Sequence, residues 1–476
     1  MIIIPLFVRH LKSISRLHVR YLNENTKDLK WRRIRDFEAK MPTSRIDPVI
    51  TKLESPEFKS IFTPELELLQ SVFKKYNHEL RIAGGAVRDL LTGKIPKDID
   101  FATTATPDEM KEMFNREEIR MLNLKGEKHG TVTARINDKE NFEVTTLRID
   151  VVTDGRHADI EFTTDWKLDA NRRDLTINSM FMDFEGRVYD YFFGYDDLKK
   201  RRVAFVGDAG TRICEDFLRI LRYFRFYGRI SEHPNSHEES IITAIKQNVE
   251  GLERISGERI WSEWNKILDG NFGVELTKKM VECGVGKYIG LPEAPDLVNF
   301  ERICQSAKIQ RLKLHPVTMI ASMLRNEQEA LNIHSRLHWS AYNRDLALFL
   351  VIHREDKISV NPLHPYQYIV LNSSGKIKDI REYIVEVLKY KGTPELAEQF
   401  EKWIPPKFPV NGNDLKELVT HRRLIGQAIM RLKKIWLDGD FKIPKEELLK
   451  RLPEVLEEIN EVWNQEKKKE VVSDSK

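Results

Sequence analysis

The chain has 476 residues, of which 41% are hydrophobic and 32% charged, a composition typical of a globular protein with about two to four domains. No apolar run approaches the ~20 residues needed to span a bilayer, so no membrane partner is expected. The three cysteines are far apart and form no C-x-x-C pair, which argues against a disulfide framework or a cysteine-rich zinc site.

The net charge of +4 is concentrated at the N-terminus. Four basic side chains precede the first acidic residue, Glu24, and leave the rest of the chain neutral by count: Arg9, Lys12, Arg16 and Arg20. Residues 1–30 mix these with bulky apolar residues at helix-like spacing, which is typical of a mitochondrial presequence; an ordinary basic amphipathic helix is the alternative. We therefore expect a mitochondrial protein, and initiation at Met41 would give a cytosolic or nuclear form of it.

Residues 80–195 alternate strand-like runs with short helices, as in a sheet domain of mixed composition. The predicted strands are Leu80–Ala83, Asp98–Ala102, Thr131–Ile136, Phe142–Leu147, Ala158–Thr163 and Val188–Phe192. From about Asp197 onward helical periodicity replaces them, for example over Glu215–Tyr227, Ile260–Leu268, Asn413–His421 and Leu424–Leu437. The sequence thus predicts an α+β chain with a small sheet domain, a long helical region and a disordered C-terminus over residues 466–476.

A pair of glycines, Gly84 and Gly85, follows the first predicted strand and opens a helix. Glycines let the backbone approach a phosphate closely, and a helix N-terminus offers unpaired N–H groups to it. Arg88, one turn further on, can add a charge-assisted bond. Most glycine pairs are simply tight turns, so this pair indicates a phosphate site only together with the residues near it.

Asp98 and Asp100 are those neighbours, two apart on a predicted strand, so that both carboxylates face the same side. Paired carboxylates with room for water and phosphate oxygens are how proteins hold catalytic Mg²⁺. We predict that Asp98 and Asp100 bind Mg²⁺. Glu143, on a later strand, is a third carboxylate that could equally be an exposed strand residue, and it is left out of the predicted site.

A second polar cluster lies within residues 172–180. Arg173 suits triphosphate oxygens because its guanidinium donates in parallel. Asp174 and Asn178, expected one helical turn apart, could bind ribose hydroxyls and favour a ribonucleotide. By itself the cluster could equally be a solvent-exposed, salt-bridged start of a helix.

The predicted helix Glu215–Tyr227 carries a polar residue at every third position. Asp216 and Arg219 are helix neighbours and are expected to contact the base, whereas Arg222 and Arg225 lie further round and suit triphosphate or RNA phosphate. Cytosine and adenine each present an amino donor beside a ring-nitrogen acceptor, which a carboxylate beside a guanidinium complements. Uracil and guanine reverse that pattern, and each unpaired polar group costs about 1–3 kcal/mol. The pair therefore predicts CTP and ATP as substrates; a simple Asp216–Arg219 ion pair on an amphipathic helix is the alternative.

These segments resemble, in order, motifs A to E of the class II tRNA nucleotidyltransferases, the family of the CCA-adding enzymes and the bacterial poly(A) polymerases. The five motifs are Gly84–Asp100, Arg172–Asn178, Asp190–Leu198, Glu215–Arg219 and Ser256–Ile260, the last followed by Glu263. Similarity is weaker through the helical C-terminus. Five motifs in family order make chance similarity very improbable.

The resemblance implies a nucleotidyltransferase head over residues 50–195 and an elongated all-α region behind it. That region would comprise a neck with the nucleotide-reading helix (196–268), a body (269–400) and a basic tail (401–465). The resemblance also implies contacts to the nucleotide from Gly85, Arg88, Arg173, Asp216, Arg219, Arg222 and Arg225, and to Mg²⁺ from Asp98 and Asp100. The segment from Thr146 through Arg156 matches a mobile loop that helps the family switch from C to A addition.

The activity implied is template-independent addition of CCA to the 3′ end of tRNA from CTP and ATP, with release of pyrophosphate by two-metal phosphoryl transfer. A poly(A) polymerase of the same family and a catalytically retired RNA-binding protein are the alternatives; retained Asp98 and Asp100 speak against the second. Six basic side chains in the tail could hold tRNA phosphates, or form a solvated helix face: Lys416, Arg422, Arg423, Arg431, Lys433 and Lys434. Nothing in the sequence indicates an oligomeric state.

Overall fold

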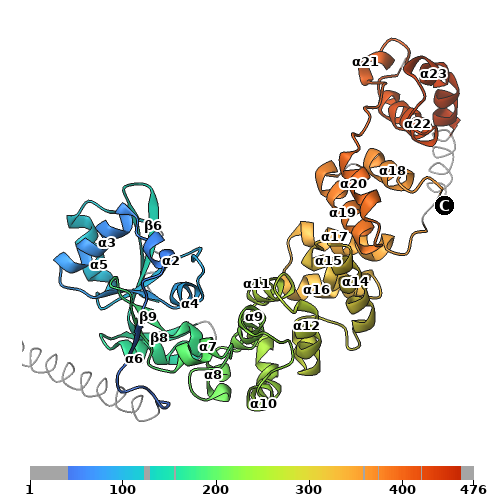
Figure 1. The fold of residues 1–476 in the computed structure, drawn as a ribbon. Coiled ribbons are helices and arrows are strands. Elements are labelled where there is room, and N and C mark those ends of the chain that lie inside the picture. Colours follow the sequence, from blue (N-terminus) through green and yellow to red (C-terminus); the bar gives the residue numbers. More distant parts are fainter. Residues whose placement is uncertain are drawn as a thin grey trace, which may run out of the picture. The chain divides into compact units, whose positions relative to one another are not determined.

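The computed structural model describes residues 41–122, 129–154, 157–357, 360–373, 375–419 and 421–461 (Figure 1). The presequence-like segment, the C-terminal residues 466–476 and residues 155–156 of the predicted mobile loop lie outside these ranges. The chain divides into two compact units, Met1–Ile289 and Gly290–Lys476.

The first unit is built on an eight-stranded sheet of order β1-β10-β9-β2-β3-β6-β5-β4, in which only β3 and β6 are parallel neighbours. Its strands are β1 (Val49–Lys52), β2 (Leu80–Ala83), β3 (Asp100–Thr103), β4 (Arg120–Leu122), β5 (Thr131–Ile136), β6 (Glu140–Thr146), β9 (Phe181–Met182) and β10 (Arg187–Tyr189). In the antiparallel pair of β2 and β3, Ile82 faces Phe101. The end of β2 therefore lies beside the start of β3, at the centre of the sheet.

One face of the sheet is covered by α3 (Pro64–Lys75) and α5 (Pro107–Arg116), which contact β5 (Figure 1). Both helices begin with a threonine cap, Thr63 or Thr106, followed by a proline at the first helical position. Alternate residues of β5 are buried, as expected for a strand that packs on one face only.

After β6 the chain forms a separate two-stranded sheet of β7 (Arg148–Asp154) and β8 (His157–Phe162), followed by α6 (Trp166–Asn171), which contacts β7. Leu147, just before β7, bonds back to Thr103 of β3 through its backbone. A hydrophobic cluster joins α6 to strands of the large sheet and consists of Ala83, Ala102, Leu147, Trp166, Ala170, Phe181, Phe192 and Val206.

Helices complete the first unit. Those between the strands, besides α3, α5 and α6, are α2 (Pro56–Ser60) and α4 (Gly85–Leu91). Those after the sheet are α7 (Gly194–Lys199), α8 (Ala209–Glu215), α9 (Arg219–Ile230), α10 (Glu239–Asn248), α11 (Gly257–Leu268), α12 (Gly273–Glu282) and α13 (Val285–Tyr288). Helix α9 packs against α11 and α12, and it does so closely at Gly228, where a Cβ would lie 2.6 Å from the carbonyl oxygen of Asn271.

The described residues of the second unit form helices and no strands. The helices are α14 (Leu297–Ile309), α15 (Pro316–Ala321), α16 (Glu327–Leu337), α17 (Ala341–His353), α18 (His364–Asn372), α19 (Ile377–Tyr390), α20 (Pro394–Lys402), α21 (Gly412–Leu415), α22 (Leu424–Asp438) and α23 (Lys445–Lys450). A core between residues 410 and 459, centred on Leu432 and Trp436, joins the last three of these helices. Across the described part of the chain, none of the helices has both the length and the apolar character to cross a bilayer.

The predicted α+β class is confirmed, and the predicted strands agree with β2, β5, β6, β8 and β10 within two or three residues at each end. Two helix predictions are wrong in part. The stretch Glu215–Tyr227 is broken after Glu215, so that α8 ends there and α9 begins at Arg219. The stretch Asn413–His421 is helical only to Leu415.

Candidate active site

The turn between β2 and α4 is the first part of the site. Gly84 has φ +64°, and a Cβ there would lie 2.9 Å from Nη1 of Arg173 and 3.3 Å from the carbonyl oxygen of Asn178. Only glycine meets both conditions without strain. The predicted glycine turn that opens a helix is therefore confirmed, with Gly85 as the first residue of α4.

The carboxylate pair lies beside this turn. Asp100 is the first residue of β3, whereas Asp98 lies in the bend before it, so the prediction that both are on one strand is wrong for Asp98. Both nevertheless face one cleft. Asp100 is exposed to solvent, but the neighbouring protein limits the hydration of its carboxylate. Burial raises the pKa of the Asp100 carboxyl, Arg173 opposes this rise, and the nearby charge of Asp98 adds to it.

Glu143 lies on β6, in parallel register with Asp100 on the neighbouring strand. Register partners point their side chains to the same face of a sheet, so Glu143 lies on the same face as Asp100. The sequence alone did not indicate this. Within the part of the chain that the structure describes, no three carboxylate, histidine or cysteine side chains converge to form a ready-made metal cluster.

The cleft has a volume of about 790 Å³ and lies within the first unit, between α4 with the loop after it and α9, α11 and α12. Six basic side chains and three carboxylates line it: Arg88, Lys94, Lys97, Arg225, Arg229 and Lys266, with Asp89, Asp98 and Asp100. Its lining is thus basic overall with one acidic corner, which suits a polyphosphate and a divalent cation together.

Arg88 is buried at the base of the cleft, with 3% of its surface exposed. It donates from Nε and Nη2 to Oδ1 of Asp89, at 3.1 and 2.9 Å, and from Nη1 to the side-chain oxygen of Asn178. Arg229 of α9 donates to the other oxygen of Asp89 at 2.7 Å. Asp89, which the sequence analysis did not select, therefore ties α4 to α9.

The segment after α6 begins with two arginines, Arg172 and Arg173, of which Arg173 lies next to the glycine turn. Asp169, at 1% exposure, accepts from Arg172 at 2.7 Å and from Nη2 of Arg173 at 3.1 Å. Burial alone would raise the pKa of the Asp169 carboxyl, but its two arginine partners outweigh burial and lower it. An acidic residue three and four positions before an arginine pair was the available signal for Asp169, and the sequence analysis missed it.

The prediction that Asp174 and Asn178 are one turn apart on a helix is wrong. A 3₁₀ turn, η2 (Thr176–Asn178), replaces the expected helix. Asp174 accepts a hydrogen bond from Nε of Arg222 at 2.6 Å, and Asn178 accepts from Arg88. Both side chains thus hold arginines in place in this structure.

The junction between α8 and α9 contains the predicted base-reading pair. Asp216 has extended backbone, with φ −152° and ψ 106°, and therefore precedes the helix instead of sharing a face of it with Arg219. The two do not form an ion pair with each other: Asp216 accepts from Arg259 at 2.7 Å, and Arg219 pairs with Glu215. Arg219 also donates to the carbonyl oxygens of Arg212 and Arg172, at 2.9 and 3.0 Å.

Four arginines along α9 each form an ion pair with a carboxylate, and none of these four pairs was predicted from the sequence. Their partners are Glu215 for Arg219, Asp174 for Arg222, Glu263 for Arg225 and Asp89 for Arg229. Three of these partners come from α4, α11 and the segment after α6, so the pairs fix α9 against the rest of the first unit. Arg225 also lines the cleft, as its predicted phosphate contact requires.

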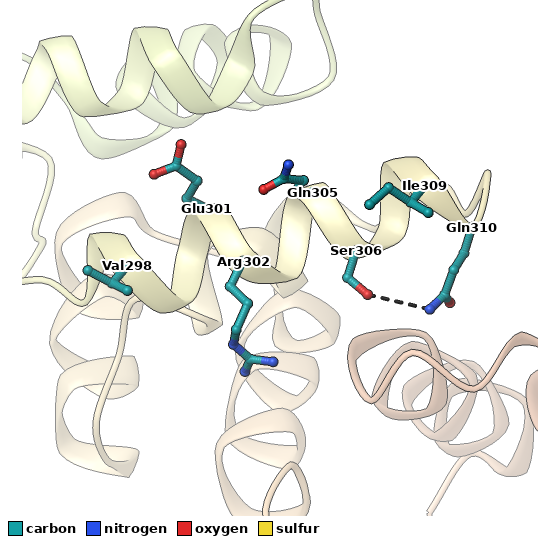
Figure 2. Close-up of a pocket in the computed structure, with 7 residues that line it drawn as sticks. All are labelled: Val298, Glu301, Arg302, Gln305, Ser306, Ile309 and Gln310. Carbon is teal, nitrogen blue, oxygen red and sulfur yellow. Dashed lines mark hydrogen bonds between the residues drawn. The ribbon is translucent and has the colours of Figure 1, made fainter.

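A second hollow, of about 440 Å³, lies on α14 in the second unit (Figure 2). Its lining consists of Val298, Glu301, Arg302, Gln305, Ser306, Ile309 and Gln310. A single carboxylate is present among these residues, so the hollow lacks the paired acids of the cleft in the first unit.

Two family descriptions match the chain between residues 80 and 297. Residues 80–204 match "Poly A polymerase head domain", and residues 237–297 match "Probable RNA and SrmB- binding site of polymerase A". The first match spans the glycine turn, the carboxylates and the segment after α6. The class of protein is therefore a nucleotidyltransferase with a head of the poly(A) polymerase type.

A similarity that covers most of the chain is to named tRNA nucleotidyltransferases. The chain is 49% identical over 403 residues to "CCA tRNA nucleotidyltransferase 1, mitochondrial" of Mus musculus, covering 84% of this chain and 92% of the mouse protein. This chain belongs to the CCA tRNA nucleotidyltransferase family.

Solved structures share the fold. The CCA-adding enzyme of Bacillus stearothermophilus, in complex with CTP, superposes with a TM-score of 0.64 at 22% identity, covering 87% of this chain and 100% of that one. The CCA-adding enzyme of Thermotoga maritima, complexed with tRNA, superposes with a TM-score of 0.56 at 22% identity, covering 88% and 100%.

Proposed function

We propose that this protein completes the 3′ end of tRNA by adding cytidine, cytidine and adenosine from CTP and ATP. The observation that carries the proposal is the cleft of the first unit, which Asp98 and Asp100 line together with several arginines. The chain that contains this cleft belongs to the CCA tRNA nucleotidyltransferase family. In each cycle the 3′ oxygen of the tRNA bonds to the α-phosphorus of the nucleotide. The bond from that phosphorus to the bridging oxygen breaks, pyrophosphate leaves, and the hydroxyl proton is lost to solvent.

Asp98 and Asp100 are the residues that would hold Mg²⁺. Their mutual repulsion contributes to the raised pKa of Asp100, and a divalent cation would relieve it. Carboxylate oxygens are the ligands that Mg²⁺ prefers, and Glu143, in register with Asp100 on β6, stays outside the proposed pair. When bound, the metal favours ionisation of the attacking hydroxyl and offsets the charge of the leaving pyrophosphate.

The glycine turn and the arginines bind the triphosphate. Gly84 and Gly85 let phosphate oxygens approach the backbone, and Arg88 and Arg173 lie directly beside the turn. Arg225 reaches the same cleft from α9. Because each arginine is already held by a carboxylate or amide, the site is organised before the nucleotide arrives, which limits the entropy lost on binding.

Asp216 and Arg219 select the base. Asp216 accepts from the amino group of cytosine or adenine, and Arg219 donates to the adjacent ring nitrogen. Asp216 pairs with Arg259, and Arg219 with Glu215, instead of with each other, so the two do not occupy each other's hydrogen-bonding positions.

The second unit provides RNA contacts in this proposal. We assign a head to residues 50–195, a neck to 196–268, a body to 269–400 and a tail to 401–465, the last supported by its own core. Exposed basic side chains on and before α22, such as Arg422 and Lys434, would hold phosphates of the tRNA with little sequence preference.

The protein acts in mitochondria in this proposal, in line with the name of its mouse relative. A form that starts at Met41 would retain the whole described fold, because β1 begins only at Val49 and Met41 packs against the hydrophobic cluster that contains Trp166. Tagged products of each start codon should separate into mitochondrial and extramitochondrial pools; identical localisation would contradict the shorter form.

Extension of a tRNA that lacks its 3′ end tests the proposed activity. Purified protein with Mg²⁺, CTP and ATP should lengthen it by three nucleotides and then stop. Continued addition of adenosine would support a poly(A) polymerase instead, and no addition at all would indicate an RNA-binding protein.

A further inference from the structure

Asp216 is held at both of its carboxylate oxygens, and one of the two donors comes from a distant helix. Oδ1 accepts from the backbone N–H of Leu218 at 3.1 Å, at the start of α9. Oδ2 accepts from Nη2 of Arg259 at 2.7 Å. Arg259 lies in the first turn of α11, 43 residues further along the chain, so α11 reaches the base-reading junction through this side chain.

The backbone contact alone would not fix the carboxylate. The carboxylate turns as one rigid plane about the Cβ–Cγ bond, and a single hydrogen bond of 3.1 Å restrains that turn weakly, because 24% of the side chain is exposed to solvent that competes for it. Arg219 does not restrain it, because Nη1 and Nη2 of Arg219 are turned toward Glu215 and two backbone carbonyls. The bond from Arg259 is thus what sets the orientation of Oδ2.

The hydrogen bond from Arg259 leaves Asp216 able to act. An ionised carboxylate offers about four acceptor sites, of which Leu218 and Arg259 use two, so an incoming amino group still finds an acceptor. A fixed acceptor discriminates better than a rotating one. A rotating carboxylate can turn away from the carbonyl of uracil and avoid the acceptor–acceptor clash that excludes it.

We propose that Arg259 is a specificity-determining positioning residue, which acts through Asp216 to exclude UTP. The inference rests on the proposed function and deepens it by assigning the rejection of the wrong base to α11 as well as to the α8–α9 junction.

The test compares kcat/KM for CTP and UTP in single-nucleotide addition to a tRNA that lacks its 3′ end. In Arg259→Met, which retains bulk without donors, the CTP/UTP ratio should fall about tenfold, through lower use of CTP and higher use of UTP. Arg259→Lys, which retains the charge but not the fork, should recover part of the ratio. Lys246→Met, on α10 and paired with Glu282, is the matched control and should leave the ratio unchanged.

A double-mutant cycle separates positioning from general damage. In an Asp216→Ala background Arg259→Met should change the ratio no further, because its partner is already gone. An equal loss with both nucleotides in Arg259→Met and Arg259→Lys, or an undiminished effect in the Asp216→Ala background, would overturn the inference. Failure of the wild-type protein to add C or A would instead refute the proposed function itself.

Discussion

Removing Asp169 should destabilise the first unit more than any cap or surface change on the same helix. Its carboxylate, 1% exposed, accepts from Arg172 at 2.7 Å, from Arg173 at 3.1 and 3.2 Å and from the backbone N–H of Arg148 at 3.2 Å. The two arginine side chains are only 16% and 19% exposed, so Asp169→Ala would leave two largely buried charges without their nearest carboxylate; Arg172 would keep Asp150, at 4.0 Å, and Arg173 the carbonyl oxygen of Asn178, at 3.3 Å. Such a loss costs about 3–5 kcal/mol. In a unit of this size each kcal/mol lowers Tm by about 2–4 °C, so Tm should fall by roughly 6–20 °C.

Thermal unfolding and nucleotide kinetics together check this prediction. Asp165→Ala is the matched control, since Asp165 caps the same helix at its exposed end and should cost much less. Because Arg173 lies beside the glycine turn, KM should rise for CTP and ATP alike while the ratio between them stays constant. A loss of Tm in Asp169→Ala no larger than in Asp165→Ala would refute the reasoning.

Gly84→Ala combines an unfavourable φ with a Cβ placed 2.9 Å from a guanidinium, so it should lower the addition of both nucleotides more than tenfold. Gly93→Ala, with φ +68° and nothing within 4 Å, is the control for backbone strain alone. Equal addition kinetics in the two variants would contradict the close-contact argument. Asp216→Asn turns an acceptor into a side chain that can also donate and should admit UTP at the expense of CTP, as single-nucleotide addition would show; continued exclusion of UTP would place base selection elsewhere. Burial alone would raise the pKa of Asp174, but Arg222 lowers it, so its contribution to stability is present above the unfolded value of about 3.9 and lost as pH falls through the lower folded pKa. Urea unfolding across pH should therefore show that the difference in unfolding free energy between the unaltered protein and Asp174→Asn falls only below about pH 4. A fall in that difference that begins above about pH 6 would contradict the reasoning.

The strands were predictable because burial on one face imposes alternation. Residues 131–136 alternate apolar and polar side chains and form β5 over the same range. The break at Asp216 was not predictable, because the local sequence contains neither glycine nor proline and continues a helical period. The partner of Asp216, Arg259, lies 43 residues away, and periodicity carries no information about it.

The same limit applies to the carboxylates of the site. Asp98 and Asp100 could be selected by their spacing next to a glycine turn, whereas the position of Glu143 beside Asp100 depends on a parallel register that only the folded sheet defines. Glu263 could be noted as part of a motif, but not its ion pair with Arg225 across two helices. The roles of all these residues remain predictions for mutagenesis.

The most direct measurement of the central claim is nucleotide addition by Asp98→Ala, alongside its affinity for tRNA. The carboxylate pair should serve chemistry alone, so addition of C and of A should fall together by about 10³-fold or more while tRNA binding and Tm stay close to those of the unaltered protein. Turnover within a few-fold of the unaltered enzyme would show that the metal is held elsewhere, and the assignment of the cleft as the catalytic site would be lost.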